Sequence, residues 1–300
     1  MSKFRLKMSR LKGEQVASQF GFETLPIDPF KIAEDESIVV EAKKPDREGM
    51  SGCIVFNDDG VGIIYATHIR SEGFRRFTVA HELGHYFLEG HPEEIMKTAP
   101  VHFSKAGFTQ GHNSIEIEAD HFASGLLMPT RLTREALYGA PVGLEGIQQL
   151  AGEAETSLTS AAIRAAECAP YPMAVIVSQG TQIAYGFMSD SFKRLDRLRF
   201  LRKGDPLPYT STRNFNSEAA NILNRESICG STRLAEWFGG EKTIALEEEI
   251  VGLGSYGYTL TVLSSDLLAD DPDEVEDEEE KLVASWTPRC HIPEGSMAVT

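Results

Sequence analysis

Hydrophobic and polar positions change their period along the chain, and the first segments predict two helices. Residues 8–20 carry apolar side chains at helical spacing, with Val16 and Phe20 on one side. Asp28 followed by Pro29 is typical of a helix start, because the carboxylate caps free amide groups and proline fits the first turn. We therefore expect a helix over residues 8–20 and a second, short helix that begins at Pro29.

The pattern then changes to strands. Residues 37–42 form an extended, largely apolar segment. Residues 51–56 and 61–66 flank the turn-forming sequence Asn57-Asp58-Asp59-Gly60, which predicts a β-hairpin. A small sheet is therefore expected before the next helix. Its edge could hold an extended peptide beside a catalytic site, or the hairpin could be purely structural.

Residues 75–87 return to helical spacing. Their apolar positions are Phe77, Ala80, Leu83, Gly84 and Phe87. On this helix His81 and His85 lie one turn apart on one face, and Glu82 lies beside them. Two imidazoles at this spacing can reach one metal ion while the carboxylate acts as a base, which is the H-E-x-x-H pattern of zinc peptidases. The alternative is an amphipathic helix with two surface histidines, but the apolar face is typical of a buried helix. Gly84 would let another segment approach closely.

A catalytic zinc site usually has three protein ligands and a water molecule, so a third ligand is needed. His91 stands where a metzincin would have its third histidine, but that motif has glycine at the position of Leu88. Residues 116–129 predict a second amphipathic helix, with Glu116 and Asp120 on one face. Glu116 can then bind the metal, as in gluzincins, while Asp120 accepts a hydrogen bond from a ligand histidine and fixes its tautomer.

Other polar residues near this motif have simpler interpretations. Glu118 points away from Glu116 on the predicted helix and is expected to be a solvated charge. His102 and His112 lie in a polar stretch and are expected to be ordinary surface histidines. His91, and after it Glu118, stay open as alternatives for the third ligand.

The second half of the chain predicts two short helices and then strands. Helices at residues 144–151 and 158–166 flank a turn, a spacing similar to a helix-turn-helix. However, Arg164 is the single basic residue of the second helix, whereas DNA contact needs several. A structural or interdomain helical module is the favoured interpretation. Further strands are predicted at residues 173–177, 182–187 and 256–263, and further helices at residues 217–224 and 231–238.

Two charged runs stand out. Residues 193–203 contain six basic side chains and are interpreted as a solvated helix face above an apolar stripe, with an anionic ligand or nucleic acid as the alternative. Residues 270–280 contain nine acidic side chains and predict a mobile loop that could attract a basic partner.

Composition narrows the class of protein. The chain has 300 residues and a net charge of −16, which disfavours tight sequence-independent binding to nucleic acid. The sequence contains no apolar run long enough to span a membrane, and residues 1–19 lack the apolar core of a secretory signal, so a cytoplasmic protein is expected. The four cysteines form no C-x-x-C pair, which excludes a cysteine-ligated zinc knuckle of that kind.

Two blocks of sequence resemble the ImmA/IrrE metallo-endopeptidase family. Residues 75–85 are similar to its Arg-Arg-Phe-Thr-x-Ala-His-Glu-Leu-Gly-His block, and residues 116–129 to its Glu-x-x-Ala-Asn/Asp-x-Phe-Ala-x-x-Leu-Leu-Met-Pro block. The resemblance extends over residues 25–135. Asp120 stands where many relatives have asparagine, and the connection between the two blocks is longer and contains histidines.

The resemblance implies that three of these residues, His81, His85 and Glu116, are metal ligands, and that Glu82 is the general base. The ion would be zinc, with manganese as the alternative. The implied substrate is a helix-turn-helix transcriptional repressor, whose cleavage would switch on stress-response or mobile-element genes.

The expected fold is an α+β protein in three parts. Residues 1–140 would be a zincin-like metallopeptidase domain, residues 141–170 a helix-turn-helix-like helical module, and residues 171–300 a GAF-like sensor domain with an acidic loop. The signal or small molecule that such a sensor would bind is not indicated, and neither tight DNA binding nor membrane association is expected. The rival hypothesis is a non-proteolytic regulator or sensor that binds DNA or a repressor, with a structural metal. The intact Glu82 disfavours it, because a structural site needs no base.

Overall fold

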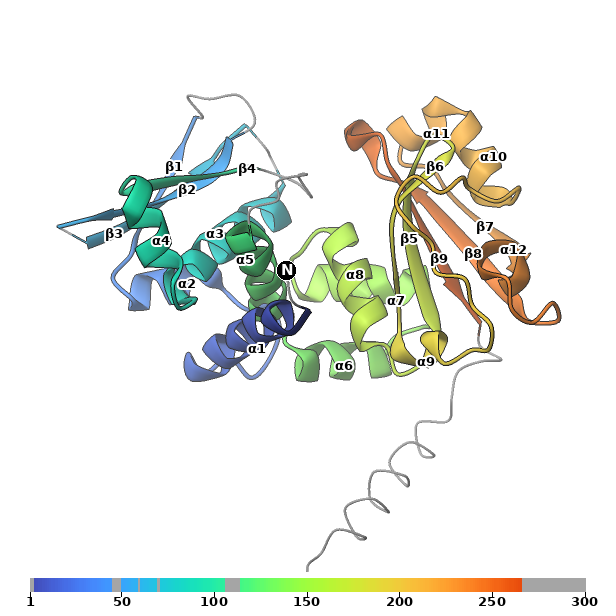
Figure 1. Cartoon of the computed structure of the whole chain (residues 1–300), viewed down its shortest axis with the longest axis horizontal. Coiled ribbons are helices and arrows are strands. Elements are labelled where there is room, and N and C mark those ends of the chain that lie inside the picture. Colours follow the sequence, from blue (N-terminus) through green and yellow to red (C-terminus); the bar gives the residue numbers. More distant parts are fainter. Residues whose placement is uncertain (1–2, 45–49, 59, 69–70, 106–113, 266–300) are drawn as a thin grey trace, which may run out of the picture.

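The structure is a computed structural model that describes the chain except residues 1–2, 45–49, 59, 69–70, 106–113 and 266–300. A β-sheet lies at each end of the described part, and helices lie between the two sheets (Figure 1). The expected mixed α+β class is therefore confirmed. The predicted acidic loop at residues 270–280 and His112 fall outside the described residues.

The N-terminal sheet has four strands in the order β1-β3-β2-β4. The strands are β1 (Val39–Lys43), β2 (Met50–Asn57), β3 (Gly60–Ala66) and β4 (Val101–Lys105). The predicted hairpin is confirmed, since β2 pairs antiparallel with β3, while β1 runs parallel to β3. Strand β4 was not predicted; it pairs antiparallel with β2 and forms one edge of the sheet.

Five helices accompany this sheet. They are α1 (Lys3–Gln19), α2 (Pro29–Asp35), α3 (Glu72–Phe87), α4 (His91–Thr98) and α5 (Ser114–Leu127). Asp28 caps α2 as predicted, accepting hydrogen bonds from the amides of Phe30 and Lys31. Helix α1 begins five residues earlier than expected and packs along α5 (Figure 1).

The motif helix α3 is held between the sheet and α5. Its apolar residues Val79 and Leu83 pack in one core with Ile54 of β2 and Phe122 of α5. A Cβ atom at Gly84 would lie 3.1 Å from the Cα atom of Ala119, closer than ordinary packing allows. Glycine at this position therefore permits the close crossing of α3 and α5, which brings both motif blocks together.

Three helices follow the N-terminal part: α6 (Thr130–Tyr138), α7 (Leu144–Glu153) and α8 (Leu158–Cys168). The predicted pair α7 and α8 is present, and Ser157 caps α8 by accepting a hydrogen bond from the amide of Ser160. Residues of both helices, such as Ile147 and Ala162, share a hydrophobic core with Val175 of the second sheet. The boundaries at residues 140 and 170 stay predictions, although this core contains residues from both sides of each boundary, from Leu137 to Val175.

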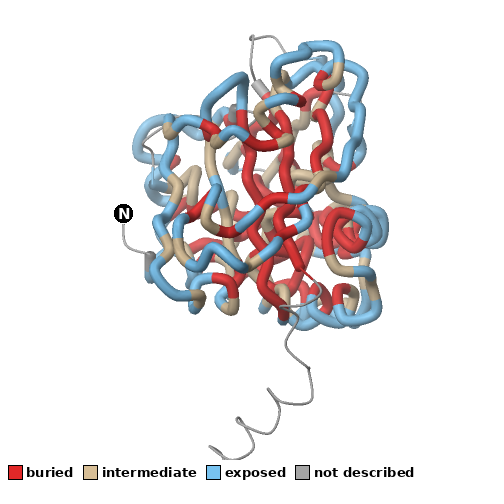
Figure 2. The backbone as a smooth tube through the Cα atoms, turned by 90° about the vertical axis from the view of Figure 1, so that its right-hand side faces the viewer, coloured by how far each residue is buried: buried red, intermediate tan, exposed pale blue. Residues whose placement is uncertain are grey.

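The C-terminal sheet has five antiparallel strands in the order β6-β5-β9-β8-β7. The strands are β5 (Met173–Gln179), β6 (Gln182–Met188), β7 (Ser227–Arg233), β8 (Ala245–Gly252) and β9 (Thr259–Ser264). The central strands β5 and β9 are buried on both faces. On β5, Val175 faces α7 and α8, whereas Ile176 packs against Trp237 on the other side. Figure 2 shows buried strands in the middle of this sheet, whereas the edge strands β6 and β7 are largely exposed or half-buried. It does not by itself confirm a GAF-like assignment.

Short helices complete this region. They are α9 (Asp190–Lys193), α10 (Ser211–Ser217), α11 (Ala219–Leu223), α12 (Leu234–Phe238) and a 3-10 turn at Gly254–Tyr256. Two predictions were wrong here. The helix expected at residues 231–238 begins only at Leu234, because Ser231 to Arg233 pair with β8. The basic run at residues 193–203 is not a helix, since α9 ends at Lys193 and Arg197 adopts φ of 59°.

The described cysteines form no disulfide. Among the described cysteines, Cys53 and Cys168 are buried, Cys229 is exposed, and all three are free thiols. Cys290 lies outside the described residues. No described helix combines the length and apolar character needed to cross a membrane.

Candidate metal centre

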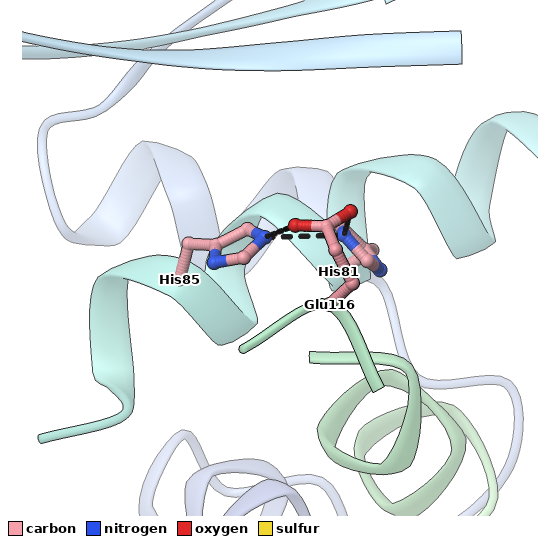
Figure 3. A group of neighbouring side chains, drawn as sticks. All are labelled: His81, His85 and Glu116. Atoms are coloured by element: carbon pink, nitrogen blue, oxygen red, sulfur yellow. Dashed lines mark hydrogen bonds and ion pairs between the residues drawn. The ribbon is translucent and has the colours of Figure 1, made fainter. Parts of the chain in front are cut away.

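Three side chains from two helices converge beneath the N-terminal sheet (Figure 3). His81 and His85 project from α3 and Glu116 from α5, and their candidate ligand atoms all lie within 4.8 Å of one another. The two Nε2 atoms are 3.2 Å apart. One oxygen of Glu116 lies 3.2 Å from Nε2 of His85, and the other lies 3.6 Å from Nε2 of His81.

These separations fit a single metal ion. Ligands held at about 2.0–2.1 Å in a tetrahedral arrangement are roughly 3.3 Å apart, close to the separations between His81, His85 and Glu116. Two imidazole nitrogens and a carboxylate oxygen form a donor set that suits zinc and leaves a fourth position for water or substrate. Manganese also accepts imidazole and carboxylate ligands. The donor set therefore fits a catalytic divalent ion.

Asp120 orients the first histidine. Its carboxylate lies 2.9 Å from Nδ1 of His81. Because Asp120 is an acceptor, Nδ1 carries the proton of the neutral ring, and Nε2 keeps its lone pair for a metal. This contact was expected with one of the candidate ligand histidines, and it is made with His81.

Glu82 lies next to the cluster and is fully buried, and neither carboxylate oxygen has a hydrogen-bond partner among the described residues. Gly52 of β2 provides the space, since a Cβ atom there would lie 2.8 Å from Oε1 of Glu82. Burial raises the pKa of Glu82 to about 7, against the opposing effect of His81. A buried carboxyl group with such a raised pKa, beside the cluster, is poised to exchange protons in the metal-free protein.

The other groups in the cluster are electrostatically coupled in the metal-free protein. Burial lowers the pKa of His85 to about 3. Burial also opposes protonation of His81, but hydrogen bonds to Asp120 and Glu116 raise its pKa well above the usual value. For Glu116, burial is outweighed by three neighbouring histidines, and its pKa is lowered. The carboxylate of Glu116 is therefore ionised and available to a cation.

His102 belongs to the site, although the sequence analysis expected an ordinary surface histidine. It lies on β4, and its Nε2 atom is 2.5 Å from Oε1 of Glu116. That expectation was wrong because β4 was not predicted. The signal was the alternation in Val101–Lys105, which places His102 and Ser104 on one face of the strand.

His91 and Glu118 lie behind the cluster. His91 is outside the group whose ligand atoms converge, and its Nδ1 atom lies 3.2 Å from Nδ1 of His85. Glu118 is only 3% exposed and pairs with Arg5 of α1 at 2.9 Å. The expectation of a solvated Glu118 was therefore wrong, because α1 covers this side of α5.

We expect Glu82 to make the metal-free protein less stable as the pH rises from about 4.5 to 7. The folded state retains a proton on Glu82 that the unfolded chain has already lost, so the unfolded state binds fewer protons in this window. Chemical unfolding of wild type and Glu82→Gln with a chelator, at both ends of the window, measures the effect. The stability difference between the two proteins should change by at most about 3 kcal/mol. A difference that does not change with pH would contradict the burial of an ionisable Glu82.

Comparison with known proteins gives a family match and a structural match. Residues 38–165 match the family model described as the IrrE N-terminal-like domain, Peptidase_M78. The fold is similar to a solved structure titled "Mycobacterium tuberculosis transcriptional regulator", with a TM-score of 0.52 and 15% sequence identity, over 88% of this chain and 82% of the other. At this identity the likeness shows the fold alone. None of the curated proteins compared with the chain matches it.

Proposed function

Since its IrrE N-terminal-like domain makes the chain a member of the ImmA/IrrE family, we propose that it is a zinc-dependent endopeptidase of the gluzincin type. One observation carries the proposal: the donor atoms of His81, His85 and Glu116 have the separations of ligands to one ion, and the buried Glu82 lies beside them. A structural zinc site would close its fourth position with a further protein ligand and would need no base.

The residues of the site would have two roles in amide hydrolysis, metal binding and proton transfer. His81, His85 and Glu116 would hold the ion, which when bound would polarise the scissile carbonyl and lower the pKa of a water molecule. Glu82 takes a proton from the attacking water and passes it to the leaving amine. Its burial keeps bulk water away from the carboxylate, so the proton taken from the attacking water can be passed on to the leaving amine.

The edge strand β4 provides a surface for the substrate chain. It lies at the end of the sheet, with β2 on its inner side and His102 directed to the cluster. An extended peptide can pair with such an edge through main-chain hydrogen bonds, and the contact of His102 with Glu116 shows that this strand borders the cluster. This arrangement supports an unfolded loop or linker as the segment that is cut.

The proposed substrate is a helix-turn-helix transcriptional repressor, whose cleavage would derepress stress-response or mobile-element genes. A basic DNA-binding protein complements a chain with a net charge of −16. The experiment is to mix the purified protein, loaded with zinc, with the repressor encoded by a neighbouring gene and to follow cleavage by mass spectrometry. Absence of cleavage with zinc bound would favour the alternative, a non-proteolytic regulator that binds DNA or the repressor.

We expect the protein to bind duplex DNA only as a weak, non-specific ligand. Arg164, the basic residue of the helix α8, is 1% exposed and pairs with Glu14 and Glu167, so it cannot contact phosphates. Titration of labelled DNA at near-physiological salt should give a dissociation constant on the order of 10⁻⁴ to 10⁻⁶ M or weaker. Sequence-specific binding at nanomolar concentration would support the regulator hypothesis instead.

A further inference from the structure

A chain of hydrogen bonds leads from His85 into the interior, away from the cluster. Nδ1 of His85 lies 3.2 Å from Nδ1 of His91, and Nε2 of His91 lies 3.4 Å from Oε2 of Glu118. An Nη2 group of Arg5 donates to the same oxygen at 2.9 Å. His85, His91 and Glu118 are 0%, 1% and 3% exposed, so solvent does not compete for these contacts.

When His85 binds a metal, the hydrogen bonds of this series can all be formed only with the donors pointing from His85 through His91 to Glu118. Nε2 of His85 must then keep its lone pair, and its proton lies on Nδ1. Nδ1 of His91 must therefore accept this hydrogen bond, so the proton of His91 lies on Nε2 and is donated to Glu118. The acceptor at the end of the chain is a carboxylate, which needs no proton of its own. Each donor thus meets an acceptor.

A reversal of the backbone after α3 brings His91 next to His85. Helix α3 ends at Phe87, and Gly90 adopts φ of 87°, a conformation that glycine allows and that turns the chain back. Helix α4 then begins with His91, so its ring lies against the ring of His85 with centroids 5.2 Å apart. The spacing that resembles a third ligand in a metzincin places His91 behind a ligand instead.

We propose that His91 and Glu118 are positioning residues that fix the tautomer and orientation of His85, the inference resting on the metal site proposed above. Asp120 fixes the tautomer and orientation of His81 in the same way, by a direct contact. For His85 the carboxylate acts through the intermediate imidazole of His91, because Glu118 contacts His91 and not His85. Arg5 holds the outer end of the chain, which makes α1 part of the support of the metal site.

A pair of variants of equal shape separates the hydrogen bond from packing. His91→Leu removes the acceptor for Nδ1 of His85, whereas His91→Asn keeps an oxygen near the position of Nδ1. Competition with a chromophoric chelator measures zinc affinity without any cleavage assay. We expect His91→Leu to weaken zinc binding about 10- to 100-fold, the range found when outer ligand partners are removed. His91→Asn should recover most of this loss.

Glu118 and a distant histidine provide the controls. Glu118→Gln keeps an acceptor for His91 and should bind zinc more tightly than Glu118→Met. His121→Leu removes the histidine of α5, which contacts Arg10 at 3.1 Å instead of the cluster, and should leave zinc affinity unchanged. Circular dichroism of each metal-free variant identifies any protein that fails to fold.

The positions of the histidine protons can also be measured in the wild-type protein, so that this test does not depend on whether the variants fold. In the zinc-loaded protein, ¹⁵N chemical shifts should show His85 protonated at Nδ1 and His91 protonated at Nε2. A His91 protonated at Nδ1, or a leucine variant that binds zinc as tightly as wild type, would overturn the inference and leave the proposed function intact. An asparagine variant as weak as the leucine variant would also overturn it. Failure of wild type to bind zinc would overturn the proposed function and this inference together.

Discussion

Glu82→Gln should abolish peptide cleavage while the protein still binds zinc. Glutamine cannot accept the proton of the attacking water, so the rate should fall by about 10²- to 10⁴-fold, the usual contribution of a general base. The candidate ligands His81, His85 and Glu116 are unchanged, and a neutral amide costs less to bury than a carboxylate that has no hydrogen-bond partner among the described residues. Zinc content and cleavage are measured on the same preparation.

The matched control is Glu93→Gln, the same change at an exposed glutamate of α4. It should leave both cleavage and zinc content as in wild type. Substantial cleavage by a pure Glu82→Gln protein would show that another group acts as the base. Loss of zinc from the same variant would instead place Glu82 among the ligands.

Glu116→Ala should weaken metal binding more than a change at any residue that only supports a ligand. It leaves two histidines and removes the only ionised ligand, so the loss of affinity should exceed the roughly 10- to 100-fold loss expected for Asp120→Ala, which removes only the support of His81. Zinc titration against a competing chelator gives the order directly. Glu93→Ala serves again as the surface control.

The ranking separates two ligand sets. If His91 were the third ligand, His91→Leu would lose the metal while Glu116→Ala would keep it. If Glu116 is the third ligand, the sequence alone predicts that a change at His91 leaves metal binding unaffected. The contact between His91 and His85 changes that expectation, and His91→Leu should rank beside Asp120→Ala.

Much of the N-terminal fold could be predicted because its elements carry local signals. Asp28 with Pro29 marks a helix start, and the turn at residues 57–60 marks a hairpin; both are present. Strands β7 and β8 were missed because they lack such signals. Strand β8 contains three consecutive glutamates, which are uncommon in strands, and its buried Glu248 is stabilised by hydrogen bonds from Thr212.

The sequence by itself determined the pairing of His81 with His85, because helical periodicity alone sets two side chains four residues apart on one face. It also determined that Glu116 and Asp120 share a face of the second helix. Only the tertiary structure decided how the two helices meet. The close crossing at Gly84 brings Glu116 to both histidines and Asp120 to His81. Positions that depend on contacts between distant segments carry no local period, which is why Glu118, His91 and His102 were misjudged or left open. Their roles follow from the packing of α1 on α5, the reversal at Gly90 and the edge strand β4.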